Sequence, residues 1–239
     1  MSQKVPDQHE VSLDVEEWVS RLRNVDMPDW GNVDGTKPGR VSDMDLDNVI
    51  DRWVSEDDIV LEVGCSKGYT SSEIANISEA EVVGVDVPEV YSNGTVENKH
   101  GRGPSPQYFS AVAPVLPFKE GSVEGVAALN SLTYLCRNIG KIAVEREQKG
   151  NRDRENVQKE YTQEAITDML DELNRVTADK SYVILGEQTD HSYLVLEKDD
   201  SEWQVEDYNS MDRRNGKSMH IRYRPWIQNE KVNYLPNEF

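Results

Sequence analysis

Cysteines, basic residues and long apolar runs are all scarce in this chain of 239 residues. The two cysteines, Cys65 and Cys136, are too isolated to form a disulfide framework or a zinc site. No apolar run approaches the roughly 20 residues that a membrane-spanning helix needs, and residues 1–10 lack the core of a signal peptide. The sequence therefore predicts a cytoplasmic protein without a metal centre or a membrane partner.

The shortage of basic residues leaves 26 Lys and Arg against 45 Asp and Glu, a formal net charge of −19. Such a chain repels phosphate backbones at long range, so nucleic acid is not expected as a partner. An acidic surface also suits concentrated salt, where repulsion is screened. This favours a halophilic source; the alternative is an ordinary acidic cytosolic protein.

Short apolar strands alternate with helices along most of the chain. Residues 1–55 are predicted to be a helical extension, with amphipathic helices near 11–25 and 46–54. Residues 56–239 are predicted to form one α/β domain, a doubly wound, mostly parallel seven-stranded sheet with helices on both faces and an antiparallel edge hairpin. The expected strands are 59–63, 82–87, 107–112, 123–129 and 181–187, and the expected helices are 69–77 and 161–176.

Two later stretches are less regular. Residues 191–199 fit a short helix or the first arm of a hairpin, and we favour the helix, followed by edge strands at 203–208 and 218–224. Residues 137–160 form an almost wholly charged and amide-rich insertion. Because it follows the fourth strand, where ligands bind in doubly wound sheets, it is interpreted as either a lid or a solvated loop.

The first predicted strand runs directly into a turn that contains glycine, Glu62-Val63-Gly64-Cys65-Ser66-Lys67-Gly68. Glycine lets the backbone approach a ligand closely, and the helix that follows directs its N–H groups at that ligand. A second acid, Asp86, ends the next strand, where it can accept hydrogen bonds from ribose hydroxyls. These features predict a nucleotide-type site, although the G-x-G-x-x-G spacing of NAD-binding folds is absent.

The turn resembles the class I S-adenosylmethionine-dependent methyltransferase signature (D/E)-x-G-x-G-x-G, with Ser66 at the middle glycine. Residues 83–89 resemble the second-strand signature of that family, and Leu116-Pro117-Phe118 with residues 121–126 resembles the motif before its fourth strand. The three matches occur in order over residues 59–135. The resemblance implies an enzyme that uses S-adenosylmethionine as cofactor and acts on a small-molecule substrate.

The resemblance also implies which residues would hold the cofactor. The loop would border the methionine part, Glu62 would orient the loop or the amino group, Asp86 would bind the ribose, and Val87 would pack on the adenine. Residues after the fourth strand would face the methionine moiety and the open substrate side. The implied cofactor-binding set is Glu62, Gly64, Cys65, Ser66, Gly68, Asp86, Val87, Val112, Ala113, Asn130 and Ser131.

Two departures from the family pattern keep an alternative open. The side chain of Ser66 crowds a place where backbone usually meets ligand, and Val112 stands where many members have an acid for the adenine amino group. A missing acceptor would cost about 1–2 kcal/mol of binding free energy. The alternative is therefore a non-catalytic, methyltransferase-like binding or partner subunit, and a homo-oligomer also remains open.

Candidates for catalysis are few, because methyl transfer from a sulfonium is an in-line displacement that relies largely on positioning. Tyr134 follows the fourth strand and His191 follows the fifth, so both fall on the substrate side. Core or lid packing is the competing interpretation of Tyr134, and a surface helix cap is that of His191. The sequence does not identify the methyl acceptor.

Overall fold

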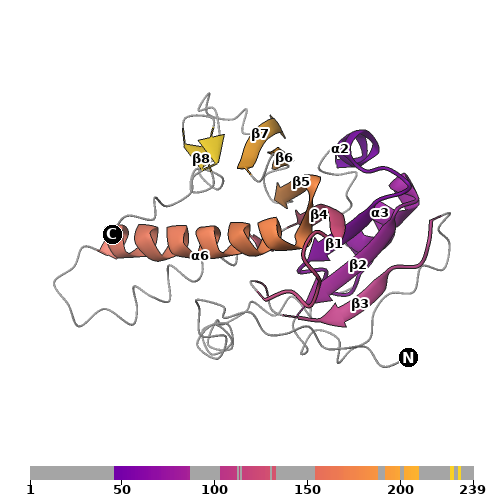
Figure 1. The fold of residues 1–239 in the computed structure, drawn as a ribbon, viewed down its shortest axis with the longest axis horizontal. Coiled ribbons are helices and arrows are strands. Elements are labelled where there is room, and N and C mark those ends of the chain that lie inside the picture. Colours follow the sequence, from indigo (N-terminus) through magenta and orange to yellow (C-terminus); the bar gives the residue numbers. More distant parts are fainter. Residues whose placement is uncertain are drawn as a thin grey trace.

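The computed structural model describes residues 46–86, 103–111, 113, 115–129, 131–132, 154–187, 192–199, 202–209, 227–228 and 231–232. Its strands form a nine-stranded sheet of order β3-β2-β1-β4-β5-β6-β7-β9-β8 (Figure 1). The parallel part consists of β1 (Ile59–Val63), β2 (Glu81–Asp86), β3 (Gln107–Ser110), β4 (Val123–Leu129) and β5 (Thr177–Glu187). The antiparallel part consists of β6 (Ser192–Asp199), β7 (Glu202–Asn209), β8 (Ile227–Gln228) and β9 (Lys231–Val232).

The sheet is covered on both faces, which confirms the predicted doubly wound α/β fold. On one face α2 (Leu46–Trp53) and α3 (Tyr69–Ser78) pack in a buried cluster with Val60, Val82 and Ile184. On the other face α6 (Arg154–Val176) packs against side chains of β1, β2, β4, β5, β6 and β7. Since α2 contributes Val49 and Ile50 to the first cluster, the end of the predicted helical extension belongs to the same core as the sheet.

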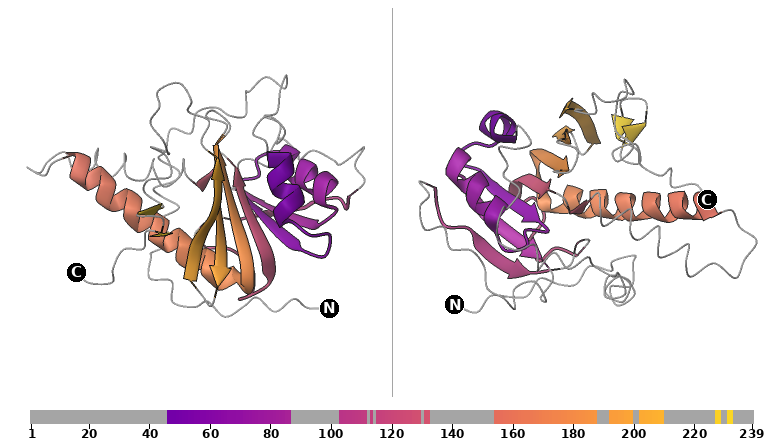
Figure 2. Two further views of the ribbon diagram at one scale, coloured as in Figure 1. Left: turned by 90° about the horizontal axis from the view of Figure 1, so that it is seen from above. Right: turned by 180° about the vertical axis from the view of Figure 1, so that it is seen from behind.

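Helix α6 is longer than the sequence pattern predicted. It begins at Arg154, so the last residues of the predicted insertion 137–160 are helical. Its buried apolar residues in the core run only from Ala165 to Val176. The first half of the helix therefore extends beyond the sheet, as the two views of Figure 2 show.

The prediction of a helix at 191–199 is wrong, because this segment is β6 and forms a hairpin with β7. The residues from Tyr193 to Leu196 are all buried. Leu194 and Leu196 face the α6 side, whereas Tyr193 and Val195 face the α2–α3 side. A strand buried on both faces gives a continuous apolar run, which periodicity alone cannot distinguish from a buried helix.

The sheet order places a topological switch point between β1 and β4. From β1 the chain passes to β2 and β3 on one side, and then returns to β4 and β5 on the other. Ligands of open α/β sheets bind in the crevice outside the carboxyl ends of the strands at such a point. The predicted helix at 11–25, the predicted strand at 218–224 and residues 137–153 lie outside the described residues.

Candidate functional site

The loop between β1 and α3 lies at this switch point and has an unusual backbone. Gly64, Ser66 and Gly68 have φ angles of 77°, 50° and 85°, all in the left-handed region that favours glycine. The N–H groups of Gly64 and Cys65 both donate to the carbonyl oxygen of Val85, at 2.8 and 3.2 Å. The loop is therefore folded back onto the end of β2 by backbone hydrogen bonds.

Ser131, which follows β4, lies against the start of this loop. A Cβ atom added to Gly64 would be 2.4 Å from the Cβ of Ser131, so only glycine fits at position 64. The Ser131 hydroxyl donates to the carbonyl oxygen of Val63 at 2.5 Å. This contact joins the carboxyl ends of β1 and β4, the two strands at the switch point.

Asp86, at the end of β2, is hydrogen-bonded to the middle of the same loop. Its Oδ2 accepts the N–H of Ser66 at 2.7 Å, and its side chain is only partly buried. A carboxylate at this position has two oxygens, so one can hold the loop while the other is turned to a ligand hydroxyl. Ser66 keeps the left-handed conformation and the exposed position of the glycine that it replaces in the signature.

Glu62 is buried beneath the loop and accepts a hydrogen bond from the hydroxyl of Ser71 in α3. Burial raises the pKa of the Glu62 carboxyl to about 7, because desolvation disfavours the charged form. The hydrogen bond from Ser71 opposes that rise, and the nearby carboxylate of Asp86 adds to it. The site thus holds a carboxyl group that is poised to titrate near neutral pH.

Tyr108 of β3 is part of the site, although the sequence analysis did not select it. Its hydroxyl donates to the carbonyl oxygen of Gly68 at 3.2 Å. A Cβ atom added to Gly84, in the middle of β2, would be 2.8 Å from the Tyr108 ring. Glycine inside a strand often marks a close approach of another group. Gly84 is therefore the feature of the sequence from which a side chain crossing β2 could have been predicted.

Seven residues of the predicted cofactor set are thereby placed around one loop: Glu62, Gly64, Cys65, Ser66, Gly68, Asp86 and Ser131. Ala113 is buried in the cluster on the α6 face, which also contains Val63 and Val85. Val87, Val112 and Asn130 of that set lie outside the described residues, as do the catalytic candidates Tyr134 and His191.

The Leu116-Pro117-Phe118 motif is held by the end of α6. Arg175 donates to the carbonyl oxygens of Phe118 and Leu116, at 2.8 and 3.0 Å, and Glu172 accepts the N–H of Leu116 at 2.6 Å. Arg175 and Glu172 also form an ion pair with an N–O distance of 2.7 Å. In this structure the described contacts of the motif bind it to α6 and the core.

Among the described residues, no group of three or more His, Cys, Asp or Glu side chains is arranged to hold a metal ion. None of the described helices is long and apolar enough to cross a membrane.

Comparison with known families agrees with the position and geometry of the loop. A family model described as a methyltransferase domain matches residues 60–146, which include β1, the loop, α3, β2, β3 and β4. This stretch of the chain is similar to methyltransferase domains. The match agrees with the predicted enzyme class and with the predicted cofactor, S-adenosylmethionine.

Solved structures of methyltransferases share part of the fold with this chain. A S-adenosylmethionine-dependent methyltransferase from Methanosarcina mazei is 20% identical, with 57% of this chain and 55% of that chain covered and a TM-score of 0.42. One from Aquifex aeolicus is 15% identical, with 62% and 66% covered and a TM-score of 0.43. A geranyl diphosphate C-methyltransferase from Streptomyces coelicolor is 14% identical, with 60% and 44% covered and a TM-score of 0.40.

The chain spans about half the length of the first of these solved structures, 55% of the Methanosarcina mazei protein. No curated protein matches the sequence. The similarity in sequence to methyltransferase domains therefore rests on residues 60–146.

The groups around the loop suit the charges of S-adenosylmethionine. S-adenosylmethionine carries a sulfonium, an amino group, a carboxylate and a ribose. Asp86 places a carboxylate beside the loop, which favours the cationic groups and the ribose hydroxyls, whereas Glu62 is buried beneath the loop. The N-terminus of α3, which begins directly after Gly68, favours the carboxylate.

Proposed function

We propose that this chain transfers the methyl group of S-adenosylmethionine to a small-molecule acceptor. The observation that carries the proposal is the hydrogen bond between Asp86 and the N–H of Ser66 at the switch point. It joins the acid at the end of β2 to a loop of left-handed residues directly before a helix. An acid, a tight loop and a helix N-terminus together form the arrangement that binds a nucleoside with an anionic substituent.

Within this proposal the loop residues Gly64, Ser66 and Gly68 border the methionine part of the cofactor. Asp86 accepts hydrogen bonds from the ribose, while Val87 and Val112 border the adenine and Asn130 faces the methionine moiety. The cofactor supplies an activated methyl group on its sulfonium. The protein therefore needs to align the acceptor with that methyl group and to exclude competing water, with a base only for acceptors that must lose a proton.

The substrate side of the site is expected above the carboxyl ends of β4 and β5. Ser131 follows β4 and already touches the loop, and β5 ends at Glu187 beside β4. Tyr134 and His191 follow these two strands in the sequence and remain the proposed base candidates. The lid interpretation of insertion 137–160 stays a prediction, because the structure describes only residues 154–160 of this segment, which belong to α6.

One reason for the alternative, a non-catalytic partner subunit, is the serine at position 66 of the loop. The structure weakens that reason, because Ser66 has a φ angle of 50° and its N–H donates to Asp86. The serine thus preserves the left-handed backbone of the glycine that it replaces. The remaining reason is Val112, and measurement of cofactor affinity decides between the two functions.

The test is calorimetric titration with S-adenosylmethionine and S-adenosylhomocysteine, at low salt and at molar KCl. We expect dissociation constants in the micromolar range for both ligands. Transfer of labelled methyl groups to a panel of small-molecule acceptors would then identify the substrate. Absence of binding under every condition would contradict the proposal and favour the partner-subunit alternative.

Replacement of Asp86 provides the first residue-level prediction. Asp86→Ala should weaken the binding of both ligands by roughly 1–3 kcal/mol, because it removes charge-assisted hydrogen bonds to the ribose. The matched control is Asp57→Ala, which removes an exposed carboxylate just before β1, at the opposite end of that strand. Equal affinities of the two variants, by titration calorimetry, would rule out the role given to Asp86.

A further inference from the structure

The side chain of Tyr108 crosses β2 to reach the cofactor loop. Tyr108 pairs with Gly84 in the parallel register of β3 and β2. A Cβ atom added to Gly84 would lie 2.8 Å from Cδ1 of Tyr108 and 2.8 Å from the Sγ of Cys65. The missing side chain of Gly84 therefore makes the space through which the ring passes over β2 and next to Cys65.

The hydroxyl of Tyr108 reaches the point where the loop becomes helix. Gly68 is the N-cap of α3, and its carbonyl oxygen accepts the first helical N–H, from Ser72, at 3.0 Å. The same oxygen accepts the Tyr108 hydroxyl at 3.2 Å. A Cβ atom at Gly68 would lie 2.1 Å from the Tyr108 oxygen, so this glycine is required by the contact as well as by its φ angle of 85°.

Tyr108 completes a set of contacts that hold the loop along its length. Val85 accepts the N–H groups of Gly64 and Cys65, Asp86 accepts that of Ser66, and Ser131 packs against Gly64. These contacts come from β2 and from the end of β4, and they hold the first half of the loop. The contact at Gly68 comes from β3 and fixes the second half, including the direction in which α3 starts.

We propose that Tyr108 is a positioning residue of the cofactor site, whose hydroxyl holds the Gly68 carbonyl and keeps the loop in its binding conformation before the cofactor arrives. This inference rests on the proposed function of the loop. A loop that is already ordered loses less conformational entropy on binding, and so binds more tightly. Burial raises the pKa of the Tyr108 hydroxyl, which therefore remains protonated and able to donate.

The experiment compares Tyr108→Phe with wild-type protein and with Tyr182→Phe. Both substitutions remove only a hydroxyl. The Tyr182 hydroxyl donates to Asp58 at 3.0 Å, next to the start of β1 and away from the loop. The measurements are the affinities for S-adenosylmethionine and S-adenosylhomocysteine by calorimetry, the hydrogen exchange of amides 64–69 without ligand, and the melting temperature.

We expect Tyr108→Phe to weaken both affinities about fivefold, the effect of one lost hydrogen bond of about 1 kcal/mol. It should also accelerate exchange in residues 64–69 of the ligand-free protein. Tyr182→Phe should lower the melting temperature while leaving affinity and loop exchange unchanged. Wild-type affinity in Tyr108→Phe with unchanged loop exchange would overturn the inference.

The affinity measurements and the hydrogen-exchange measurements separate this inference from the proposed function. If the wild-type protein binds neither ligand, the proposed function fails. Loop exchange in the ligand-free Tyr108→Phe protein still decides whether the tyrosine orders residues 64–69. If wild-type protein binds and the two tyrosine variants lose affinity equally, the effect is one of general stability and the positioning role is wrong.

Discussion

At the scale of single residues, Glu62 makes the stability of the fold depend on pH. Its carboxyl group is buried, and its pKa is raised from 4.5 to about 7 in the folded protein. Between these two values the folded protein holds a proton that the unfolded chain has lost. The contribution of Glu62 to stability is therefore full below pH 4.5 and is lost as the pH rises through about 7.

Glu62→Gln should remove this dependence, because the amide does not titrate. Relative to wild type, the free energy of unfolding of the variant should rise by about 3 kcal/mol from pH 4.5 to 7.5. Urea denaturation across this range measures the difference. Glu56→Gln, which changes an exposed carboxylate in the turn before β1, should show a constant difference from wild type. A constant difference for Glu62→Gln as well would disprove the raised pKa.

Ser66 shows how one residue can depart from a motif without losing its geometry. Left-handed backbone costs residues other than glycine about 1 kcal/mol, a penalty that short polar side chains partly offset. The N–H of Ser66 donates to the Asp86 carboxylate, a charge-assisted hydrogen bond of comparable strength. The loop therefore retains the form of the glycine signature with serine in its centre.

At the scale of elements, the end of α6 fixes the segment between β3 and β4. Arg175 and Glu172 lie in the last turns of the helix. Arg175 donates to the carbonyl oxygens of Leu116 and Phe118, and Glu172 accepts the N–H of Leu116. Arg175 is partly buried, with 31% of its side chain exposed. Its guanidinium thereby holds the loop before β4 against the end of α6.

Arg175→Ala should lower the free energy of unfolding by about 2 kcal/mol, because it leaves two partly buried carbonyl oxygens without their charged donor. Arg52→Ala is the matched control. Arg52 pairs with Asp207 at 2.5 Å, but 55% of its side chain is exposed, so its loss should cost about 0.5 kcal/mol. Denaturant titration of the two variants measures the contrast. Equal losses would contradict the structural role of Arg175.

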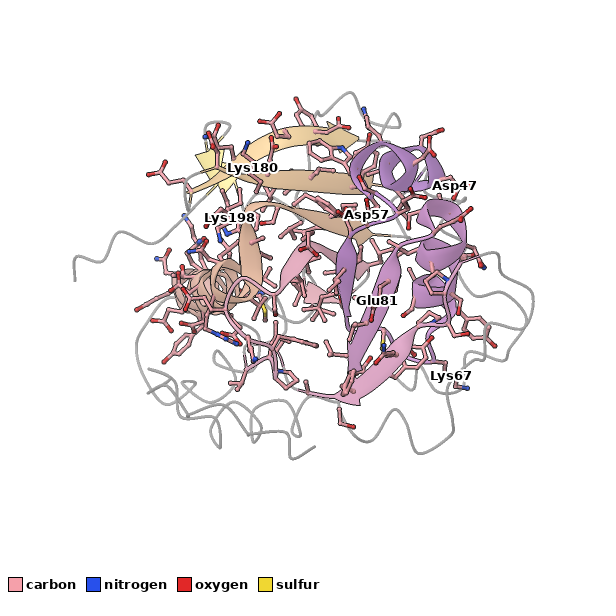
Figure 3. The ribbon with its side chains drawn as sticks, turned by 45° about the vertical axis from the view of Figure 1, so that its right-hand side comes forward. Asp47, Asp57, Lys67, Glu81, Lys180 and Lys198 are labelled. Carbon is pink, nitrogen blue, oxygen red and sulfur yellow. The ribbon has the colours of Figure 1, made fainter. Side chains whose placement is uncertain are left out.

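At the scale of the whole molecule, the net charge of −19 is the dominant property. Among the lysines labelled in Figure 3, Lys67 lies well apart from Lys180 and Lys198, and Lys198 is buried. With 45 acidic against 26 basic residues in the chain, repulsion between the acids outweighs attraction. Salt reduces the range of such repulsion from about 10 Å at 0.1 M to about 3 Å at 1 M.

Raising KCl from 0.1 to 2 M should therefore increase the melting temperature. If screening of the repulsion raises the free energy of unfolding by about 2 kcal/mol, the increase is about 5 °C or more. Thermal unfolding followed by circular dichroism measures this shift. Sucrose of equal osmolality is the control, because it does not screen charge. A melting temperature that is the same at both salt concentrations would remove the support for a halophilic source.

Across these scales, the parts predicted correctly are those with local causes. Strands β1, β2, β4 and β5 contain short apolar runs, and β1, β2 and β5 end at an acid or directly before a glycine. The loop is a pattern within residues 62–68. Each of these signals is complete within about ten residues of chain, so it can be recognised without any knowledge of what packs against it.

The sequence by itself determined the strand–loop–helix unit and its acid partner Asp86, because backbone conformation and motif spacing are local. Tertiary structure alone decided that 192–199 is a strand, since burial on both faces erases the periodic signal. It alone brought Tyr108 to Gly68 across 40 residues and Arg175 to Phe118 across 57. Such contacts depend on which strands become neighbours, and that choice is made by the whole sheet.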